Sequence, residues 1–203
     1  MLAPAVAEAV GVDADVDMVR EATAQAPPNA RFVLMRAEEL PGDLGTFDLV
    51  TFAQSFHWMV QDLVARTVHG MLRAGGAVVH VGATTHRGEV SDVPYDAIGE
   101  LVRSYLGPAR RAGAGSLPDG TPRWEDEAFI AAGFEGPKRI DVPAHTHVRT
   151  ADEIVASVFS QSSSAPHLFG ERVDEFEREL RSLIGEGPFT ERFHEVGLSI
   201  WRR

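Results

Sequence analysis

An acidic residue near the start of the chain has the position of a nucleotide ligand. Asp13 ends the apolar run Ala-Val-Gly-Val at residues 9–12, which has the composition of a short buried strand. In open α/β folds, an acid at the end of such a strand commonly accepts hydrogen bonds from ribose hydroxyls, and a glycine-rich turn precedes it by about 20 residues. Here 12 residues precede Asp13, and Gly11 is the one glycine among them. The sequence therefore predicts the second half of a nucleotide pocket without its first half.

The remaining chemistry-bearing side chains favour neither a metal site nor a hydrolase. The chain has no cysteine, which excludes thiolate ligands and a cysteine nucleophile. His145 and His147 would share one face of a strand, but no third ligand is identifiable, so we expect no metal. His80 lies in an apolar run and is expected in the core, whereas His167 follows a serine run between two helices. No serine occupies the G-x-S-x-G turn of a serine hydrolase.

Composition and charge exclude further classes of function. The 203 residues carry 30 acidic and 19 basic side chains, for a net charge of −11, so the surface is expected to repel phosphate backbones. The pairs Arg110-Arg111 and Arg202-Arg203 are interpreted as solvated surface. We therefore expect no nucleic-acid partner. No apolar run approaches 18 residues and no signal peptide is recognisable, so we expect a cytoplasmic protein without membrane association. The excess of arginine over lysine suggests a bacterial source with a GC-rich genome.

The elements that would position Asp13 alternate between strands and helices. Apolar runs predict buried strands, and apolar residues at helical spacing predict helices between them. The expected strands are 9–13, 31–36, 47–53 and 76–82, and the expected helices are 16–25 and 60–73, the latter ended by Gly75-Gly76. This alternation is typical of a doubly wound α/β fold with a mostly parallel sheet.

The second half of the chain has a different pattern, with more helices. Helices are expected at 94–106, 125–132, 150–160 and 171–184, strands at 138–142 and 194–201, and a mobile loop at 107–124. Thr150 with Glu153 three residues later predicts a capping box. We expect one domain over 1–203, with a partial cofactor-binding half at 1–85, an acceptor or lid region at 86–185 and a final strand region at 186–203.

Three stretches together resemble class I S-adenosylmethionine-dependent methyltransferases that act on small molecules. They are Gly-Val-Asp-Ala-Asp-Val-Asp-Met at 11–18, Arg-Ala-Glu-Glu-Leu-Pro at 36–41, and Phe-Asp-Leu-Val at 47–50 continuing through Ala-Gln-Ser-Phe-His-Trp at 53–58. The third resembles the branch whose donor-facing loop contains His-Trp. Met-Leu-Arg-Ala-Gly-Gly at 71–76 and Ala-Ala-Gly-Phe at 131–134 are also similar to family segments. The resemblance implies a Rossmann-like fold with an antiparallel C-terminal strand and a helical lid insertion.

The resemblance also implies roles for single residues. Asp13, with Ala14 beside it, would accept from both ribose hydroxyls, and Met18 would lie against adenine. Ala37 and Glu38 would border the adenine edge, with Glu38 accepting from the exocyclic amine. Ala53 and Gln54 would line the loop that faces the methyl donor, and His57 would orient the acceptor or serve as a base. Arg36 stands where family members often carry an aspartate.

Other interpretations of these residues remain open at this point. Asp13 could cap the following helix, and Met18 could belong to the core. Glu38 and Glu39 could be solvated charges. The pair His57-Trp58 could be a packed loop anchor.

The early position of Asp13 predicts that the first strand and the glycine-rich loop of the resembled fold are missing. That strand is central in the family order 3-2-1-4-5-7-6, so its loss would leave two open strand edges or force a new pairing. We therefore expect a truncated methyltransferase fragment whose binding of S-adenosylmethionine is impaired. A non-catalytic remnant or interaction module, and a nicotinamide-dependent oxidoreductase, remain as alternatives.

Overall fold

A computed structural model describes residues 2–83, 90–108, 111–112, 115–116, 125–161 and 163–203. The contacts divide the chain into two compact units. Unit 1 comprises Met1–Val81, Pro122–Arg139 and Leu198–Arg203, and unit 2 comprises Gly82–Thr121 and Ile140–Gly197. All of the residues implied in donor binding belong to unit 1.

Unit 1 begins with a strand–helix–strand segment. Strands β1 (Ala9–Asp13) and β2 (Ala30–Leu34) pair in parallel, from Ala9 opposite Ala30 to Asp13 opposite Leu34. Helix α1 (Val16–Ala24) connects them, as a parallel pair requires a crossover connection. A short 3-10 helix, η1 (Ala3–Ala5), precedes β1. The predicted parallel pairing and the predicted helix are confirmed, although β2 ends two residues earlier than expected.

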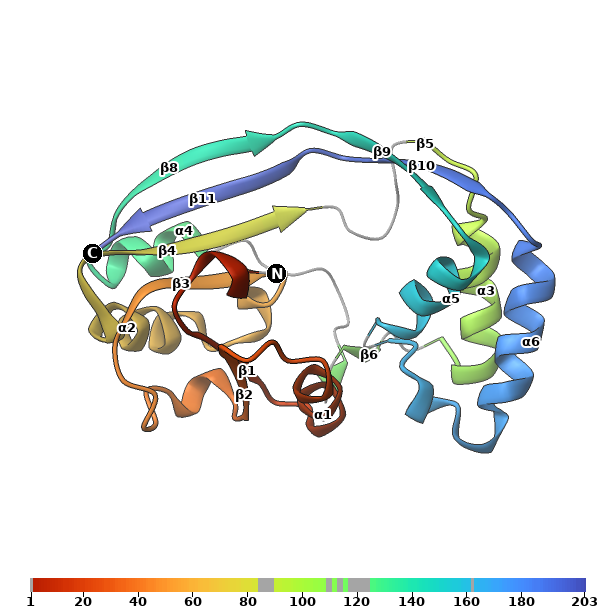
Figure 1. The fold of residues 1–203 in the computed structure, drawn as a ribbon, viewed down its shortest axis with the longest axis horizontal. Coiled ribbons are helices and arrows are strands. Elements are labelled where there is room, and N and C mark those ends of the chain that lie inside the picture. Colours follow the sequence, from red (N-terminus) through yellow and green to blue (C-terminus); the bar gives the residue numbers. More distant parts are fainter. Residues whose placement is uncertain (1, 84–89, 109–110, 113–114, 117–124, 162) are drawn as a thin grey trace. The chain divides into compact units, whose positions relative to one another are not determined.

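A four-stranded sheet forms the larger part of unit 1. Its order is β3 (Phe47–Ala53), β4 (Leu72–Ala83), β11 (Val196–Arg202) and β8 (Glu135–Val142). The pair β3 and β4 is parallel, whereas β11 runs opposite to β4 (Figure 1). The amide of Arg203 accordingly donates to the carbonyl of Gly76 over 3.0 Å, next to the start of β4. A mixed α/β fold with an antiparallel C-terminal strand is therefore present.

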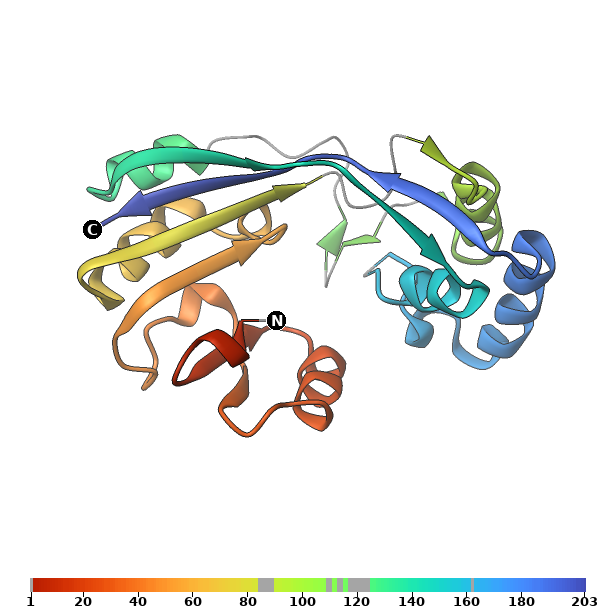
Figure 2. The same ribbon diagram turned by 45° about the horizontal axis from the view of Figure 1, so that its top comes forward.

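In the described residues, the β1–β2 pair and the four-stranded sheet are separate sheets. Among the residues that the structure describes, β1 pairs with β2 alone and β3 pairs with β4 alone, so no described strand pairs with the other edge of either. Figure 2 shows β3, β4, β11 and β8 side by side, with β1 and β2 apart from them.

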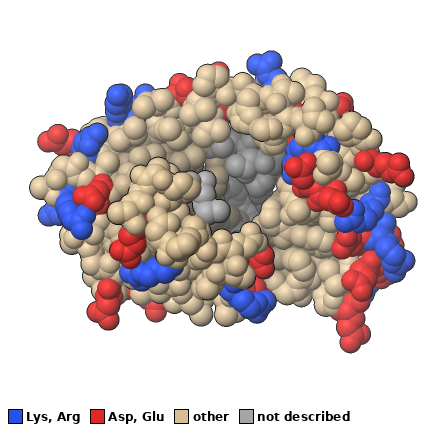
Figure 3. Space-filling view, viewed as in Figure 1, with Lys and Arg blue, Asp and Glu red and all other residues tan. Residues whose placement is uncertain are grey.

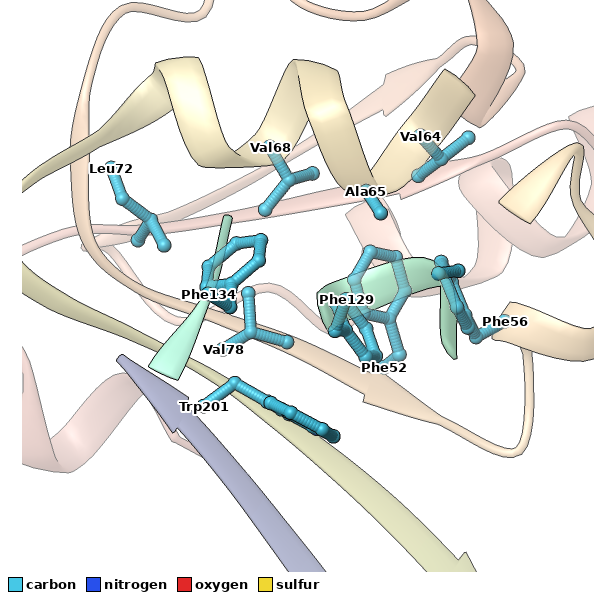
Figure 4. Close-up of a cluster of buried hydrophobic side chains, with 11 residues drawn as sticks. Phe52, Phe56, Val64, Ala65, Val68, Leu72, Val78, Phe129, Phe134 and Trp201 are labelled. Carbon is cyan, nitrogen blue, oxygen red and sulfur yellow. The ribbon is translucent and has the colours of Figure 1, made fainter. Parts of the chain in front are cut away.

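Two helices cover one face of the four-stranded sheet. Helix α2 (Gln61–Met71) and helix α4 (Glu125–Ala131) pack against each other and against the sheet. Figure 4 shows the buried side chains between them, including Phe52, Phe129 and Trp201. Phe129 and Trp201 are fully buried, with ring centroids 5.5 Å apart. This cluster is called core 1, and it includes Phe52 and Phe56 near the carboxyl end of β3.

Unit 2 combines a small antiparallel sheet with helices. The sheet has the strand order β5 (Val90–Ser91), β10 (Phe189–Phe193) and β9 (His145–Arg149). Its helices are α3 (Tyr95–Leu106), α5 (Ala151–Phe159) and α6 (Val173–Ile184). The 3-10 helices η4 (Pro166–Leu168) and η5 (Gly170–Arg172) precede α6. The predicted capping box of Thr150 and Glu153 is confirmed. The helices enclose a second cluster, core 2, centred on Phe169 and Phe176, which stack with centroids 4.0 Å apart.

The structure corrects the expected end of helix α2. The helix ends at Met71, and Leu72 already has the extended backbone of β4. Leu72 is fully buried and lies opposite Phe47, so core packing and strand pairing outweigh two further helical residues. Gly75, with φ of +76°, and Gly76, where a Cβ would lie 2.9 Å from a backbone oxygen, form a bend inside the strand. On the preceding helix, Ala65 is buried and Leu63 is exposed.

Two further segments differ from expectation. Within the predicted loop 107–124, the described residues include the two-residue strands β6 (Arg111–Ala112) and β7 (Gly115–Ser116), and 109–110, 113–114 and 117–124 lie outside the described residues. Strand β10 has no counterpart in the prediction, because its alternating sequence Phe-Thr-Glu-Arg-Phe is short and strongly polar.

Candidate functional site

Asp13 ends β1 with an exposed carboxylate. Its Oδ1 accepts a hydrogen bond from the amide of Asp15 over 2.8 Å. Asp15 is the residue that caps α1, since its Oδ1 accepts from the amides of Asp17 at 2.8 Å and Met18 at 3.1 Å. The helix cap considered for Asp13 therefore belongs to Asp15. Asp13 closes a tight turn through one carboxylate oxygen and has further lone pairs for a ligand.

The neighbouring Ala14 and Met18 are also on the surface of unit 1. Ala14 is exposed, and Met18 is 50% exposed. No residue of α1 is buried, so Met18 is not a core residue. An exposed thioether beside a strand-ending carboxylate gives an apolar contact next to a hydrogen-bond acceptor.

Glu38 lies in the 3-10 helix η2 (Ala37–Glu39) and reaches a distant part of the chain. Its Oε1 accepts from the amide of Val60 over 2.9 Å, and its Oε2 lies 3.5 Å from Nε of Arg36. The Val60 amide is the largest cause that lowers the pKa of Glu38 below 4.5, and Arg36 adds to it. Glu38 is thus a partnered carboxylate and not a solvated charge, while Ala37 packs against core 1.

Gln54 has an unusual backbone conformation at the end of β3. Its φ is +54°, and among the described residues it is the one non-glycine with positive φ. Its amide donates to the carbonyl of Val81 over 3.3 Å, so the turn follows directly from the β3–β4 pairing. Ala53 before it is exposed. Left-handed backbone at a non-glycine residue often marks a functional site.

The segment after Gln54 is anchored by Phe56. Residues Phe56–Trp58 form the 3-10 helix η3, and Phe56 is fully buried. Its ring stacks on Phe129 with centroids 4.7 Å apart and lies 4.8 Å from Phe52 (Figure 4). His57 is half-buried and Trp58 is 45% exposed. Phe56 therefore anchors this loop, a role that the sequence left open for the pair His57-Trp58. Phe56 was not predicted, because a single phenylalanine in a loop has no distinguishing pattern.

His57 and His80 share an electrostatic environment with the start of α4. Burial lowers the pKa of His57 below 6.5, Glu125 raises it in part, and His80 lowers it further. Burial also lowers the pKa of His80, against the opposing effect of Glu125 and Asp126. The ring of His80 lies 6.4 Å from that of Phe56. His80 is therefore half-buried at the border of core 1, and both imidazoles favour the neutral form.

Among the described residues, no group of three or more histidine, cysteine, aspartate or glutamate side chains could hold a metal ion. His145 and His147 pack against each other and against Phe193, with centroids between 4.7 and 5.8 Å apart. His167 lies in η4 of unit 2. In the part of the chain that the structure describes, no helix is both long and apolar enough to cross a bilayer.

On the face drawn in Figure 3, basic side chains lie among aspartates and glutamates. Arg181 pairs with Asp152 at 2.6 Å and Glu177 at 2.8 Å, and Arg172 pairs with Glu175 at 3.0 Å. The charges of these two arginines are thus balanced by neighbouring carboxylates.

The candidate residues fall into two connected groups in unit 1. Asp13 ends β1, Ala14 lies in the turn that follows, and Met18 lies in the first turn of α1. Glu38 is joined to the segment of His57 through Val60, and that segment begins at Gln54. Gln54 was predicted from its place after β3, but its strained backbone has no signal in the sequence. The bond between Glu38 and Val60 was likewise not predicted, because it joins residues 22 positions apart.

Comparisons with known proteins find methyltransferases. Residues 1–76 match the sequence family described as "Methyltransferase domain". No curated protein matches the chain in sequence. Three solved structures are similar in fold. The YcgJ protein of Bacillus subtilis is 18% identical with a TM-score of 0.50, over 100% of this chain and 85% of that chain. A putative methyltransferase from Bacillus halodurans is 16% identical with a TM-score of 0.51, over 99% and 85%.

The third structure has a bound ligand. It is the N-methyltransferase NodS from Bradyrhizobium japonicum in complex with S-adenosyl-L-homocysteine, which is 11% identical with a TM-score of 0.50, over 100% of this chain and 69% of that chain. At these identities the likeness concerns the fold. The shared fold is the Rossmann-like fold of methyltransferases.

Proposed function

We propose that this chain carries the donor-binding part of an S-adenosylmethionine-dependent methyltransferase that acts on a small-molecule acceptor. One observation supports the proposal most. The segment that matches the methyltransferase domain, residues 1–76, contains every candidate donor contact from Asp13 to Gln54. The fold similarity to solved methyltransferases agrees with it.

The side chains of the first group, together with Ala37 and Glu38, fit the nucleoside part of such a donor. Asp13 keeps lone pairs free of the Asp15 amide, so it can accept from both ribose hydroxyls. Met18, with Ala14 nearby, supplies an exposed apolar surface for the adenine ring. Ala37 would border the adenine edge. The Glu38 carboxylate, which already accepts a hydrogen bond from the Val60 amide, would also accept one from the exocyclic amine of adenine.

The second group fits the methyl-transfer end of the site. S-adenosylmethionine supplies an electrophilic methyl group on a sulfonium, so the protein contributes mainly alignment of the acceptor. Ala53 and Gln54 would line this end. His57, whose lowered pKa keeps the imidazole neutral near pH 7, would accept the proton that the acceptor loses or orient an acceptor carboxylate.

We further propose that these 203 residues by themselves bind the donor weakly. No glycine precedes Gly11, so no glycine-rich turn before β1 is available to receive the methionine part of the donor. The open edges of β1 and β3 agree with an incomplete pocket. The same open edges favour the alternative, in which the chain is a non-catalytic interaction module that pairs with a partner strand.

The test is a titration of the 15N-labelled chain with S-adenosylhomocysteine, followed by amide chemical shifts. We expect saturable shifts at residues 13–18, 36–38 and 53–57 with a dissociation constant in the millimolar range. Asp13→Asn should weaken binding by about tenfold, since a charge-assisted hydrogen bond is lost. Asp43→Asn, which changes an exposed acid elsewhere in unit 1, should not.

Three other outcomes of the titration would each overturn part of the proposal. A dissociation constant in the micromolar range would refute weak donor binding, and the proposed methyltransferase function would stand. Absence of localised shifts at millimolar ligand would refute donor binding and favour the interaction module. Shifts with NADH in place of S-adenosylhomocysteine would favour the oxidoreductase.

A further inference from the structure

The hydrogen bond between Glu38 and Val60 joins two halves of the candidate site. Glu38 belongs to η2, which follows β2, whereas Val60 immediately precedes α2 and serves as its N-cap residue. No side chain caps α2 from within its own sequence. The carboxylate of Glu38 receives the Val60 amide over 2.9 Å and so supplies a hydrogen-bond partner at this helix start from 22 residues away.

This bond is of the strong, charge-assisted kind. The Glu38 side chain is 20% exposed, and its other oxygen lies near the Arg36 guanidinium. The lowered pKa of Glu38 means that the carboxylate stays ionised, and therefore accepting, throughout the neutral range. Glu39 differs, because its carboxylate accepts from the amide of Arg36 at 2.7 Å and stays within η2.

The bond closes one end of a very short segment. Phe56 anchors the other end in core 1, where it is fully buried. Three residues lie between Phe56 and Val60, and they include His57 and Trp58. The amides of Trp58 and Met59 are already bonded to Ser55 and Phe56 within η3. The backbone on either side of His57 is therefore held at two points, at Phe56 by burial and at Val60 by the Glu38 carboxylate.

We propose that Glu38 is a positioning residue that holds His57 in place through the Val60 amide. The carboxylate couples η2, which borders the proposed adenine site, to the segment that would face the acceptor. Loss of the Glu38 carboxylate frees Val60 and lets the His57 segment move, without removing any side chain that would touch the acceptor. The relevance of His57 to the acceptor rests on the proposed function, whereas the coupling itself does not.

Amide hydrogen exchange of the full chain without ligand tests the coupling. In Glu38→Ala, exchange at Val60 should accelerate at least tenfold after correction for the intrinsic rate. Glu38→Asp should behave like Glu38→Ala, because the shorter side chain keeps the negative charge but is too short to accept the hydrogen bond from the Val60 amide. Glu38→Gln retains an acceptor oxygen and should show a smaller increase. Glu39→Gln, the matched control, should leave Val60 unchanged.

The titration of His57 is the second readout. Its pKa, followed by the NMR shift of the ring Cε1 proton, should rise toward 6.5 in Glu38→Ala as the imidazole becomes more hydrated. Unchanged Val60 exchange and an unchanged His57 titration in folded Glu38→Ala would overturn the proposal. If Glu38 acts as an adenine ligand alone, its variants lose S-adenosylhomocysteine binding while Val60 exchange stays constant. If the proposed function fails and the coupling holds, exchange changes although no ligand binds.

Discussion

At the scale of single residues, Gln54 is the one non-glycine with positive φ among the described residues. A non-glycine residue in the left-handed region costs about 1–2 kcal/mol. Gln54 adopts this conformation at the carboxyl end of β3, where its amide donates to Val81. The turn directs the chain from the sheet into η3. A strained residue at this place agrees with a role of its side chain in the site.

Substitutions at Gln54 separate backbone strain from side-chain function. Gln54→Gly should leave the free energy of unfolding within about 1 kcal/mol of the wild type, because relief of strain is offset by the greater entropy of the unfolded chain. Gln54→Val should lower it by about 1–2 kcal/mol, since a β-branched residue resists positive φ. Urea denaturation measures both, and equal stability of the two variants would contradict this assignment of strain. Both should lose ligand-induced shifts at residues 53–57.

His80 and His57 give the stability of the protein a defined dependence on pH. Their folded-state pKa values lie below the unfolded value of 6.5, so the unfolded chain binds more protons once the pH falls below 6.5. Stability from the neutral imidazoles is complete above pH 6.5 and is lost as the pH decreases through the lowered pKa values. Glu125 opposes the lowering at both histidines.

Urea denaturation at pH 7.5 and pH 5.0 measures this dependence. His80→Gln should lose less stability between the two pH values than the wild type, because one titrating imidazole is removed. Glu125→Gln should lose more, since the carboxylate that supports the imidazolium forms is absent. Glu135→Gln, at an exposed position of β8, is the control for the charge change alone. The same pH dependence in all four proteins would show that these histidines are not the cause.

At the scale of elements, a buried polar network joins β10, β9 and α3 in unit 2. Glu191 of β10 is completely buried. It accepts from the Tyr95 hydroxyl over 2.6 Å and from Nη1 of Arg149 over 3.2 Å. Burial, and then the neighbouring Glu191, raise the pKa of Tyr95. The network connects the end of β9 and the start of α3 to the central strand of the small sheet.

Replacement of Glu191 should lower the free energy of unfolding more than loss of the Tyr95 hydroxyl. Glu191→Ala should lower the free energy of unfolding by about 3–5 kcal/mol, because it leaves Arg149 mostly buried without its carboxylate. Tyr95→Phe should cost about 1–2 kcal/mol, the value of one hydrogen bond to a charged group. Chemical denaturation followed by circular dichroism measures both. A smaller cost for Glu191→Ala than for Tyr95→Phe would refute the central place of the carboxylate.

The same elements show which features the sequence could predict. Strands β1 and β3 were predicted to the residue, because continuous apolar runs between polar residues mark buried strands. The Thr150 capping box was predicted because it is local. The end of α2 was not, because burial of Leu72 opposes the local helical signal. Bonds between distant residues, such as that of Glu38 with Val60, depend on the tertiary fold and leave no local pattern.

At the scale of the whole molecule, the chain builds two hydrophobic cores. Core 1 is formed by α2, α4 and the four-stranded sheet around Phe129, and core 2 by α3, α5 and α6 around Phe176. Both phenylalanines are fully buried. Every candidate donor contact lies in unit 1, so the stability of core 1 bears directly on the site. The two clusters share no residue, which makes separate perturbation possible.

Substitutions in the two cores should therefore have separate effects. Phe129→Ala and Phe176→Ala each remove a fully buried ring and should each cost about 3–5 kcal/mol. In native-state hydrogen exchange, Phe129→Ala should accelerate exchange in α2 and β3, and Phe176→Ala should accelerate it in α3, α5 and α6. Exchange at residues 53–60 should also accelerate in Phe129→Ala, because Phe56 stacks on the Phe129 ring. Equal acceleration of all these segments by either variant would mean that the two cores unfold together, and the site would then depend on both.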